Sequence, residues 1–388
     1  MPVIERIKGY EKSLVDWRHD IHAHPELGFQ ETRTADLVAE KLAAFGCEVH
    51  RGIGKTGVVG RLKAGTSARS IGLRADLDAL PIHETNHFAY RSRHEGRMHA
   101  CGHDGHTAML LGAAKYLAET RQFDGTVNFI FQPAEEGLGG GDAMVKDGLF
   151  QRFPCNAIFG MHNRPGLAVG KFAIRSGAMM AGGAYFDIAI EGKGAHGARP
   201  ESGIDPVIVA SHITTALQTI VARNVRPIDT AVVSVTQIHA GDAYNVIPQQ
   251  AFIRGTARAF SNETLALIET NMRRIATHVA SAFGAGAMLD FRVVFLPLVN
   301  DVAETAFIAD TAAMLVGDEN VNRNNNLVMA SEDFSFMLEA CPGAYIQIGN
   351  GDGAGDCEVH NPDYDFNDAI LPLGASLFAR LAERKLAS

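Results

Sequence analysis

The sequence lacks the features that direct a chain into or across a membrane. No apolar run approaches the length that a bilayer span requires. The opening stretch, MPVIERIKGYEKSLVDWRHD, carries charges throughout and contains no apolar segment of the secretory kind. The 5 cysteines are an odd number, and no short-spaced pair suggests a disulfide framework. We therefore expect a cytoplasmic protein in a reducing compartment.

Positive charge is also scarce. The chain has 35 lysines and arginines against 44 aspartates and glutamates, a formal net charge of −9. This excess argues against nucleic acid or an anionic membrane as the main partner. Internal repeats and low-complexity tracts are absent. The 46% of hydrophobic residues is typical of a folded protein, and 388 residues exceed one comfortable core, so two domains are expected.

Helix-like and strand-like segments alternate over roughly the first 180 residues. The runs SIGLRAD and GTVNFIFQ suit buried strands, and HTAMLLGAAKYLAE between them suits a helix. A further amphipathic helix is expected in ETRTADLVAEKLAAFG. This repeated βαβ order predicts an α/β fold for the larger domain, with a mostly parallel sheet flanked by helices.

The pattern changes at about residue 180, after the glycine-rich stretch RSGAMMAGGAYF. A strand, a helix, two strands, a helix and a strand follow, and this βαββαβ order is typical of a ferredoxin-like α+β fold. From Pro297 onward the order of helix, strand and helix returns. We therefore expect a discontinuous larger domain of residues 1–181 and 296–388, with a smaller domain of residues 182–295 inserted into it.

The stretch MHACGHDGHTAML, residues 98–110, concentrates side chains that bind metal ions. Cys101 and His103 are one residue apart, so both can converge on one ion or on a close pair of ions. The glycines at 102 and 105 let the backbone approach closely. Taken alone, either side chain would more often be a packed or surface residue.

Three further segments place ligand-type residues after a strand or in a connecting loop. FIFQPAEEGLGGG carries Glu135 and Glu136, for which a solvated acidic loop is the alternative. AIFGMHNRP carries His162 and CEVHNPDYDF carries His360, and either histidine alone could be structural. Together the segments supply five metal ligands, too many for one tetrahedral zinc and suited to two divalent ions (Zn, Mn, Co or Ni): Cys101, His103, Glu136, His162 and His360.

Two such ions would lower the pKa of a shared water and polarise a substrate carbonyl. Glu135, outside the ligand set, could move the proton of that water to a leaving nitrogen. The predicted chemistry is therefore hydrolysis of an amide. Asp76, Asp78 and Asp333 could orient ligands through hydrogen bonds. Loop capping is the alternative for the first two, and a helix N-terminal position for the third.

Three residues of the inserted region are candidates for substrate contacts. His196 lies between glycines in GKGAHGARP, and Asn245 follows a β-rich run in GDAYNVIP. Both could donate to a carbonyl oxygen or a carboxylate. Arg258 in GTARAF could bind a substrate carboxylate through two hydrogen bonds. The alternative, that Arg258 forms a surface salt bridge, explains its presence at least as well.

The ordered motifs HAHPELGFQE, RADLDALP, HACGHDGHTAMLLGAA, QPAEEGLGG, GMHNRP, GKGAHGARP, NVIP, SEDFSF and VHNP resemble those of one family. The chain resembles the metal-dependent aminoacylases of the hippurate hydrolase and auxin-conjugate amidohydrolase group, within a clan of dinuclear metallopeptidases. The resemblance implies a catalytic domain with an inserted lid or dimerisation domain, and two metals on the five ligands named above. It also implies Glu135 as general acid and base. In the wider clan, the residues matching His196 and Asn245 hold the tetrahedral intermediate, often from the partner subunit.

The chain departs from the wider clan at Asp76-Leu77-Asp78, where the clan usually has histidine–x–aspartate. It follows the cysteine-containing subgroup in this respect. The departure leaves the role of Asp76 open. We expect a dinuclear-metal amidohydrolase that cleaves N-acetyl or N-benzoyl amino acids to a carboxylate and a free amino acid. Its partners would be that small-molecule substrate and further copies of the chain, in a homodimer or homotetramer through the inserted domain. The alternatives are a dipeptidase or carboxypeptidase on the same scaffold, a cysteine-nucleophile amidase using Cys101, and a non-enzymatic binding module.

Overall fold

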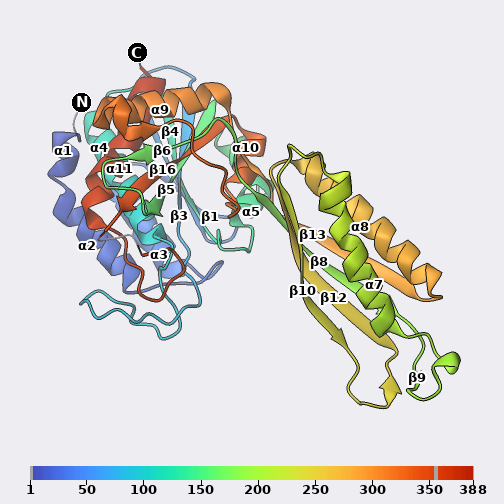
Figure 1. Ribbon diagram of the computed structural model, residues 1–388. Helices are drawn as coiled ribbons and strands as arrows, with labels where there is room; N and C mark the ends of the chain where they lie inside the picture. The colour runs from blue at the N-terminus through green and yellow to red at the C-terminus, as the bar shows by residue number, and fades with distance from the viewer. Residues whose placement is uncertain (1–2, 354–356, 388) are drawn as a thin grey trace. The chain divides into compact units, whose positions relative to one another are not determined.

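The computed structural model describes residues 3–353 and 357–387, and the chain divides into two compact units (Figure 1). The first unit contains the residues up to Met179, Val299–Asn326, and those from Asp333 onward. The second contains Met180–Leu298 and Leu327–Glu332. The short return segment belongs to the second unit because the Ala181 N–H donates to the carbonyls of Val328 and Ala330, at 3.0 and 3.1 Å. In the described part of the chain, no helix combines the length and apolar character needed to span a membrane.

The first unit is built on an 8-stranded sheet with the order β1-β2-β4-β3-β5-β16-β6-β15, counted over the described residues. Its central strands β4, β3, β5 and β16 run parallel to one another, and β2 and β6 flank them antiparallel. The strands are β1 (Glu48–Ile53), β2 (Gly57–Ala64), β3 (Ser70–Asp76), β4 (Gly125–Gln132), β5 (Ala157–Pro165), β6 (Phe172–Ala173), β15 (Val321–Asn322) and β16 (Gly343–Gly351). The predicted α/β class with a mostly parallel central sheet is confirmed.

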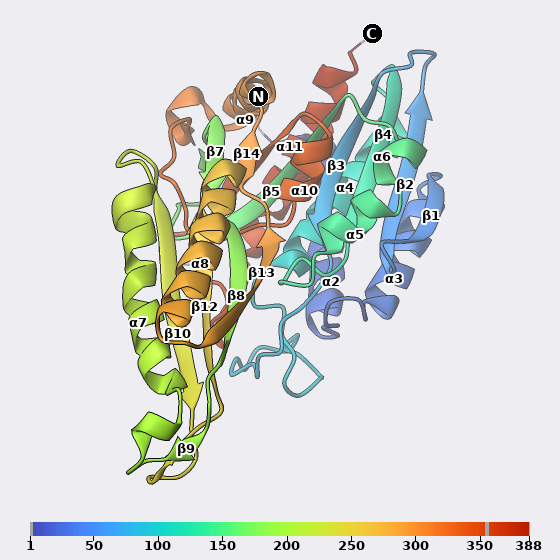
Figure 2. The ribbon, with the colours of Figure 1, turned by 90° about the vertical axis from the view of Figure 1, so that its right-hand side faces the viewer.

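Helices cover both faces of this sheet (Figure 2). Helices α4 and α11 pack against each other over the central strands, α3 covers β1 and β2, and α9 covers β16. Along β5, Phe159 and Met161 join the core beneath α4 and α11, whereas Gly160 faces Phe334 beside α10. The helices are α1 (Glu5–Lys8), α2 (Glu11–His22), α3 (Thr32–Ala44), α4 (His103–Thr120), α5 (Gly140–Lys146), α6 (Leu149–Arg152), α9 (Val302–Val316), α10 (Ser335–Ala340) and α11 (Leu371–Lys385). A small separate pair joins β14 (Leu298–Asn300) to β7 (Gly177–Met180).

The second unit has the predicted βαββαβ order, and its sheet order β10-β12-β8-β13 is that of a ferredoxin-like fold. All its strand pairs are antiparallel. Helix α7 contacts β10 and β12, and α8 contacts β8 and β13, so the apolar sides of both helices close one core. The elements are β8 (Gly182–Glu191), α7 (Pro206–Thr219), β10 (Ala231–Ala240), β12 (Gln250–Ala259), α8 (Asn262–Ala282) and β13 (Gly286–Phe295), with β9 (Ala195–His196) and β11 (Val246–Ile247) as a separate ribbon. Helix α7 ends at Thr219, and a short π-helix, Ile220–Asn224, follows it directly.

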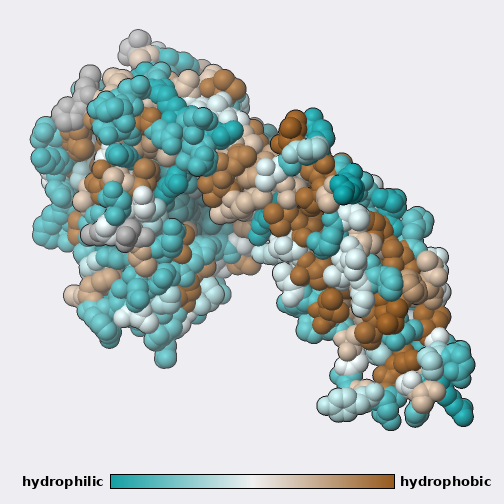
Figure 3. All heavy atoms as spheres, in the orientation of Figure 1, coloured by the Kyte–Doolittle hydropathy of each residue, from teal (hydrophilic) through white to brown (hydrophobic). Residues whose placement is uncertain are grey.

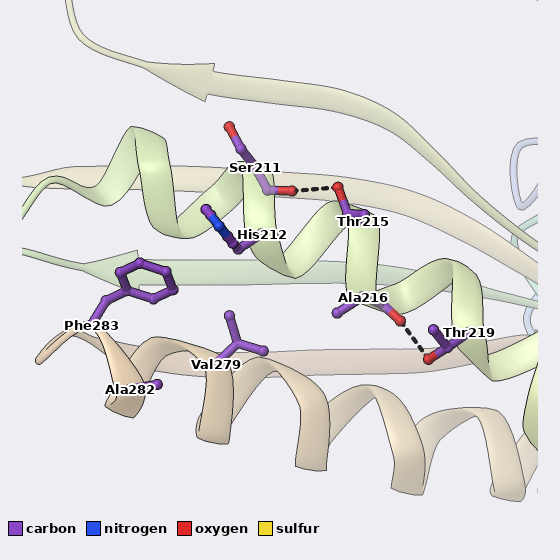
Figure 4. A pocket seen from close by; sticks show the side chains of 8 residues that line it. All are labelled: Ser211, His212, Thr215, Ala216, Thr219, Val279, Ala282 and Phe283. Carbon is purple, nitrogen blue, oxygen red and sulfur yellow. Dashed lines mark hydrogen bonds between the residues drawn. The ribbon is translucent and has the colours of Figure 1, made fainter.

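The surface of the second unit exposes apolar side chains, which Figure 3 shows in brown. Between α7 and α8 lies a groove of about 550 Å³, where the rings of His212 and Phe283 are tilted by 52° with their centroids 4.7 Å apart (Figure 4). Helix α7 and strand β10 contain no charged residue. Strand β10 is also an edge of its sheet. This edge therefore lacks the charges that usually protect an exposed strand from pairing with another chain.

Candidate metal centre

The ends of the central parallel strands bring the predicted site segments together. Strands β4, β3, β5 and β16 are neighbours in that order, so their carboxyl ends share one edge of the sheet. Asp76 ends β3 directly opposite Gln132 at the end of β4, and Glu135 and Glu136 follow three and four residues later. His162 lies near the end of β5. The buried strands thus fix where these polar side chains emerge.

Helix α4 brings the cysteine and histidine of the HACGH motif to the same edge. Gly102 caps the helix with φ +93°, a left-handed conformation that favours glycine, and His103 is the first helical residue. The Cys101 Sγ lies 3.3 Å from His162 Nε2. The loop before the last helix places His360 Nε2 3.2 Å from Glu136 Oε1. Several groups of three residues have ligand atoms that all lie within 4.8 Å of one another. Two of them contain Cys101 and are the candidate ligand groups: Cys101, His103 and His162, and Cys101, Glu136 and His360. The others are Asp76, His103 and His106; His103, Glu135 and Glu136; and Glu135, Glu332 and Asp333.

The histidines of this cluster present ring nitrogens suited to a cation. His103 Nδ1 donates to the Asp78 backbone carbonyl at 2.8 Å, and His162 Nδ1 donates to the Asn163 carbonyl at 2.6 Å. Because a carbonyl only accepts, both protons must lie on Nδ1, which leaves the Nε2 lone pairs available. His103 Nε2 and Glu136 Oε1 are buried and make no hydrogen bond to a described residue. Buried atoms of this kind fit a divalent ion, which would compensate them.

The electrostatics of the cluster favour a proton on His103 and His360, whereas burial and the charges of His106 and His103 hold the pKa of His162 well below its usual range. Burial lowers the pKa of His103, but the negative charges of Asp76 and Cys101 outweigh burial and raise that pKa well above its usual range. Contacts with Cys101 and Glu136 raise the pKa of His360 to about 10. Burial raises the pKa of the Cys101 thiol. Surroundings that stabilise a proton on these histidines would also stabilise a metal ion, which would release the protons from the thiol and the rings.

Glu135 has a carboxylate oxygen within 4.8 Å of ligand atoms of Glu136 and His103, and the backbone around it fixes its position. It is 7% exposed, and its Oε1 accepts a hydrogen bond from the Asp333 N–H at 3.2 Å. The preceding Ala134 has φ +51°, and its N–H donates to Glu31 Oε1 at 2.8 Å. Glu31 therefore stabilises the strained turn directly before Glu135. Glu136 in turn donates its N–H to Asp78 Oδ2 at 3.0 Å.

Asp76 and Asp78 contact different parts of the cluster. Asp78 holds His103 and Glu136 through the two hydrogen bonds already given. Asp76 Oδ1 contacts His106 Nδ1 at 2.6 Å, and its Oδ2 accepts from Arg74 Nη1 at 2.8 Å. Burial raises the pKa of Asp76, but the charges of His103, His106 and Arg74 outweigh it and hold that pKa well below its usual range. Asp76 thus stays ionised and orients His106.

Asp333 lies at the N-terminal end of α10 and belongs to a buried network. Its Oδ1 accepts from Gln132 Nε2 at 2.6 Å and from Arg74 Nη2 at 3.3 Å, and its Oδ2 accepts from the Gly141 N–H at 2.8 Å. Arg74 Nε also donates to Gln132 Oε1 at 2.8 Å. The Arg74 guanidinium therefore connects Asp76, beside the histidines, to Asp333, beside Glu135.

Sequence reasoning missed several residues that support this site. Arg74 and Gln132 stand in quoted motifs, but nothing in their spacing shows that they meet Asp333, 201 residues beyond Gln132. Asn163 contacts His106 Nε2 at 2.8 Å and donates to the Tyr364 hydroxyl at 2.6 Å. A second buried group ties α2 to the first turn of α4, since Asp104 accepts from Arg18 Nη1 and contacts His22 Nδ1, at 3.2 and 2.8 Å. In the sequence, the histidines of the motif HACGHDGH were the only signal that could have pointed to these supporting contacts.

The candidate substrate residues of the second unit lie at two separate places. His196 pairs with Val246 between β9 and β11, and the Gly197 N–H donates to the Asn245 carbonyl at 2.7 Å. Both residues are exposed, on a ribbon beyond the Gln250 end of the sheet (Figures 1 and 2). Arg258 lies at the opposite end of β12, beside Gly183, and its buried Nη1 has no hydrogen-bond partner among the described residues. At about 3.3 Å per step, the eight steps along β12 from Gln250 to Arg258 span roughly 26 Å.

Comparison with known proteins identifies the family to which the chain belongs. The model of peptidase family M20/M25/M40 matches residues 72–384. Over 386 residues the chain is 46% identical to the hippurate hydrolase of Campylobacter jejuni, covering 100% of both chains. It is 40% identical to an IAA-amino acid hydrolase of Arabidopsis thaliana, covering 96% of this chain and 86% of the relative. It is 35% identical to thermostable carboxypeptidase 2 of Saccharolobus solfataricus, covering 98% of each.

A solved structure extends the likeness to the fold. The YXEP protein of Bacillus subtilis, described as a dinuclear metal binding peptidase from the M20 family, matches with a TM-score of 0.85 and 35% identity. The match covers 98% of this chain and 99% of that one. The resemblance to the aminoacylase and hippurate hydrolase group is thereby confirmed, and divalent metals are indicated as cofactors. The chain belongs to peptidase family M20/M25/M40 and is a hydrolase of acyl-amino acid amides.

Proposed function

We propose that this protein hydrolyses N-acyl amino acids, with N-acetyl and N-benzoyl compounds as substrates, at a pair of divalent ions. The supporting observation is the orientation of His103 and His162, whose Nδ1 protons are committed to backbone carbonyls and whose Nε2 atoms lie with Cys101. Glu136 and His360 complete the proposed ligand set around the same sulfur. Thiolate, imidazole and carboxylate together suit zinc, cobalt, nickel or manganese.

When bound, the ions would lower the pKa of a water molecule and polarise the substrate carbonyl. The protein itself supplies the proton transfer through Glu135, which is left outside the proposed ligands. Its carboxylate accepts the proton of the attacking water and returns it to the amide nitrogen as the C–N bond breaks. The Asp333 N–H and the Glu31-stabilised turn keep this carboxylate in position. A fixed base of this kind is worth roughly 10²–10⁴-fold in rate.

The second unit is proposed to contribute substrate contacts through His196, Asn245 and Arg258. His196 and Asn245 would donate to the developing oxyanion, and Arg258 would bind a carboxylate. These contacts cannot all come from one copy of the unit, because β12 separates Arg258 from the other two by roughly 26 Å. One small substrate that used all three would therefore need residues from two copies.

This requirement supports a homodimer or homotetramer formed through the second unit. The uncharged edge strand β10 and the uncharged helix α7 beside it offer a self-complementary surface, on which Val207, Ile208 and Ile238 are exposed by 41, 47 and 49%. Pairing of β10 with its copy would extend the sheet and cover these side chains. Cys47, Cys101, Cys155 and Cys341 are free thiols, which agrees with a reducing compartment, and we place the enzyme in the cytoplasm.

The proposal is tested by comparing Glu135→Gln with Glu136→Gln in metal content and in turnover of N-benzoylglycine and N-acetyl amino acids. Glu135→Gln should keep both ions and lose at least about 100-fold in kcat, whereas Glu136→Gln should lose metal as well as activity. Near wild-type turnover of Glu135→Gln would remove Glu135 from its role. Activity that survives a chelator would favour a thiol amidase based on Cys101.

A peptidase activity is the second candidate, because the carboxypeptidase of S. solfataricus is among the relatives. The two activities differ in the acyl group rather than in the bond cleaved, and discrimination between apolar groups is worth only about 1–3 kcal/mol. Dipeptides and N-acyl amino acids should therefore be compared by kcat/KM on one preparation. A higher kcat/KM for dipeptides would replace the aminoacylase assignment with a dipeptidase or carboxypeptidase.

A further inference from the structure

Arg164 is a half-buried cation on the same face of β5 as His162. Along this strand the half-buried side chains at 162 and 164 alternate with the buried Met161, Asn163 and Pro165. Side chains two residues apart point to one face of a sheet, with Cα atoms about 6.6 Å apart. The guanidinium is therefore anchored next to a proposed metal ligand.

Two neutral side chains hold Arg164 in place. Its Nη1 donates to Asn325 Oδ1 at 2.9 Å and to Gln347 Oε1 at 3.0 Å. Asn325 Nδ2 also donates to Gln347 Oε1 at 3.0 Å, which closes a triangle and fixes the orientation of both amides. Gln347 lies opposite His162 in the β5–β16 register. The Arg164 guanidinium is thus held in one orientation by two neutral partners, which do not compensate its positive charge.

No carboxylate in residues 3–353 and 357–387 lies within 4.0 Å of the Arg164 guanidinium. The two fully buried arginines differ in this respect, since Arg18 contacts Asp104 and Arg74 contacts Asp76. The Nε and Nη2 atoms of Arg164 make no hydrogen bond to a described residue and are not among the buried unsatisfied atoms, so this edge of the guanidinium reaches solvent. That edge has the geometry that binds a carboxylate through two parallel hydrogen bonds.

We propose that Arg164 binds the free carboxylate of the N-acyl amino acid and so selects substrates that carry one. This inference rests on the proposed function and revises one part of it, because it assigns the substrate carboxylate to Arg164 of the first unit in place of Arg258. In an N-acyl amino acid, three bonds of about 1.3–1.5 Å separate the scissile carbonyl carbon from the carboxylate carbon. The two groups therefore lie roughly 3–4 Å apart, which suits a carbonyl beside the ligand cluster and a carboxylate at a side chain two residues along the strand.

The test compares N-benzoylglycine with N-benzoylglycinamide, which lacks the carboxylate, on the wild type, Arg164→Met and Arg164→Lys. Arg164→Met should lose about 10- to 100-fold in kcat/KM for the acid, the range expected for a hydrogen-bonded charge, and change by less than about twofold for the amide. Arg164→Lys should keep part of the preference for the acid, because it keeps the charge but not the two-pronged geometry. Thermal unfolding and metal content should match the wild type.

Arg323→Met is the matched control, because Arg323 is two residues from Asn325 and its charge is already compensated by Asp310 and Asp318. It should leave both rates unchanged. Equal losses for acid and amide in Arg164→Met would overturn the inference and leave the proposed function intact. Loss of the acid preference in Arg258→Met but not in Arg164→Met would overturn it in favour of Arg258.

Equilibrium binding to zinc-loaded Glu135→Gln protein gives a readout that needs no turnover. Adding Arg164→Met to this background should weaken binding of N-benzoylglycine at least about tenfold and leave binding of the glycinamide unchanged. If the wild type hydrolyses neither compound but Arg164→Met weakens binding of the acid alone in the Glu135→Gln background, the proposed function fails and the carboxylate site stands. Unchanged binding of the acid would overturn the site directly.

Discussion

Gly102 joins the two adjacent candidate ligands Cys101 and His103, and alanine at this position tests how tightly the site is built. Its φ of +93° is a conformation that residues with a Cβ rarely adopt. An added Cβ would lie 2.3 Å from Asn163 Oδ1 and 2.7 Å from the Tyr364 hydroxyl. Those two atoms belong to buried side chains that are hydrogen-bonded to each other, so neither can move aside without breaking that bond.

The expected cost of Gly102→Ala has two parts. The left-handed backbone costs roughly 1–2 kcal/mol for a residue with a Cβ. Overpacking against Asn163 and Tyr364 costs about 1–3 kcal/mol more. Gly96→Ala is the matched control, because Gly96 has φ +73° but nothing within 4 Å of its added Cβ. The control should lose only the backbone part, so the two variants should differ by roughly 1–3 kcal/mol.

Urea unfolding of the metal-free proteins measures this difference, and a titration with zinc measures what it does to the site. Gly102→Ala should be the less stable variant and should bind zinc at least about tenfold more weakly, because its Cβ pushes the chain between two ligands. Gly96→Ala should bind zinc like the wild type. Equal stabilities for the two variants, or unchanged zinc affinity in Gly102→Ala, would refute the tight cradle described here.

Three further predictions concern charge and metal binding. Arg74→Met should destabilise the protein by about 3–5 kcal/mol in urea unfolding, because it leaves the buried Asp76 and Asp333 without their shared cation. Burial lowers the pKa of His22, but hydrogen bonds to Asp104 and Glu84 outweigh burial and raise that pKa to about 9. Protonated His22 therefore stabilises the folded protein fully below pH 6.5, and this stabilisation is lost as the pH rises through 9. Wild-type metal-free protein should therefore lose about 3 kcal/mol relative to His22→Gln over that interval, and parallel pH curves would contradict this. Cys101→Ser should lower the metal content measured by elemental analysis, since both candidate ligand groups contain this sulfur.

Local pattern was enough to predict much of the fold. Alternating apolar strands and amphipathic helices gave the α/β class, and the βαββαβ order gave the second unit. Local pattern also placed four candidate ligands after strands or in loops: Cys101, Glu136, His162 and His360. Because the carboxyl ends of parallel strands share an edge, their convergence followed from topology rather than from spacing.

The residues that sequence reasoning missed are those whose roles depend on distant partners. Arg74 is important because it meets Asp76 and Asp333, and the second contact links residues 259 positions apart. Arg164 stood in the quoted motif GMHNRP, but a sequence cannot show that a cation has no carboxylate beside it. The separation of Arg258 from His196 depends on strand register, which composition and periodicity leave undetermined.

The central claim is that Cys101, His103, Glu136, His162 and His360 surround two metal ions while Glu135 stays unligated. Anomalous diffraction from crystals of the metal-loaded protein, collected on both sides of the metal absorption edge, tests it most directly. The account predicts two peaks about 3.5–4 Å apart, with the Cys101 sulfur about 2.3 Å from at least one of them. A single peak, or a pair of ions that binds Glu135 and leaves Cys101 uncoordinated, would contradict it.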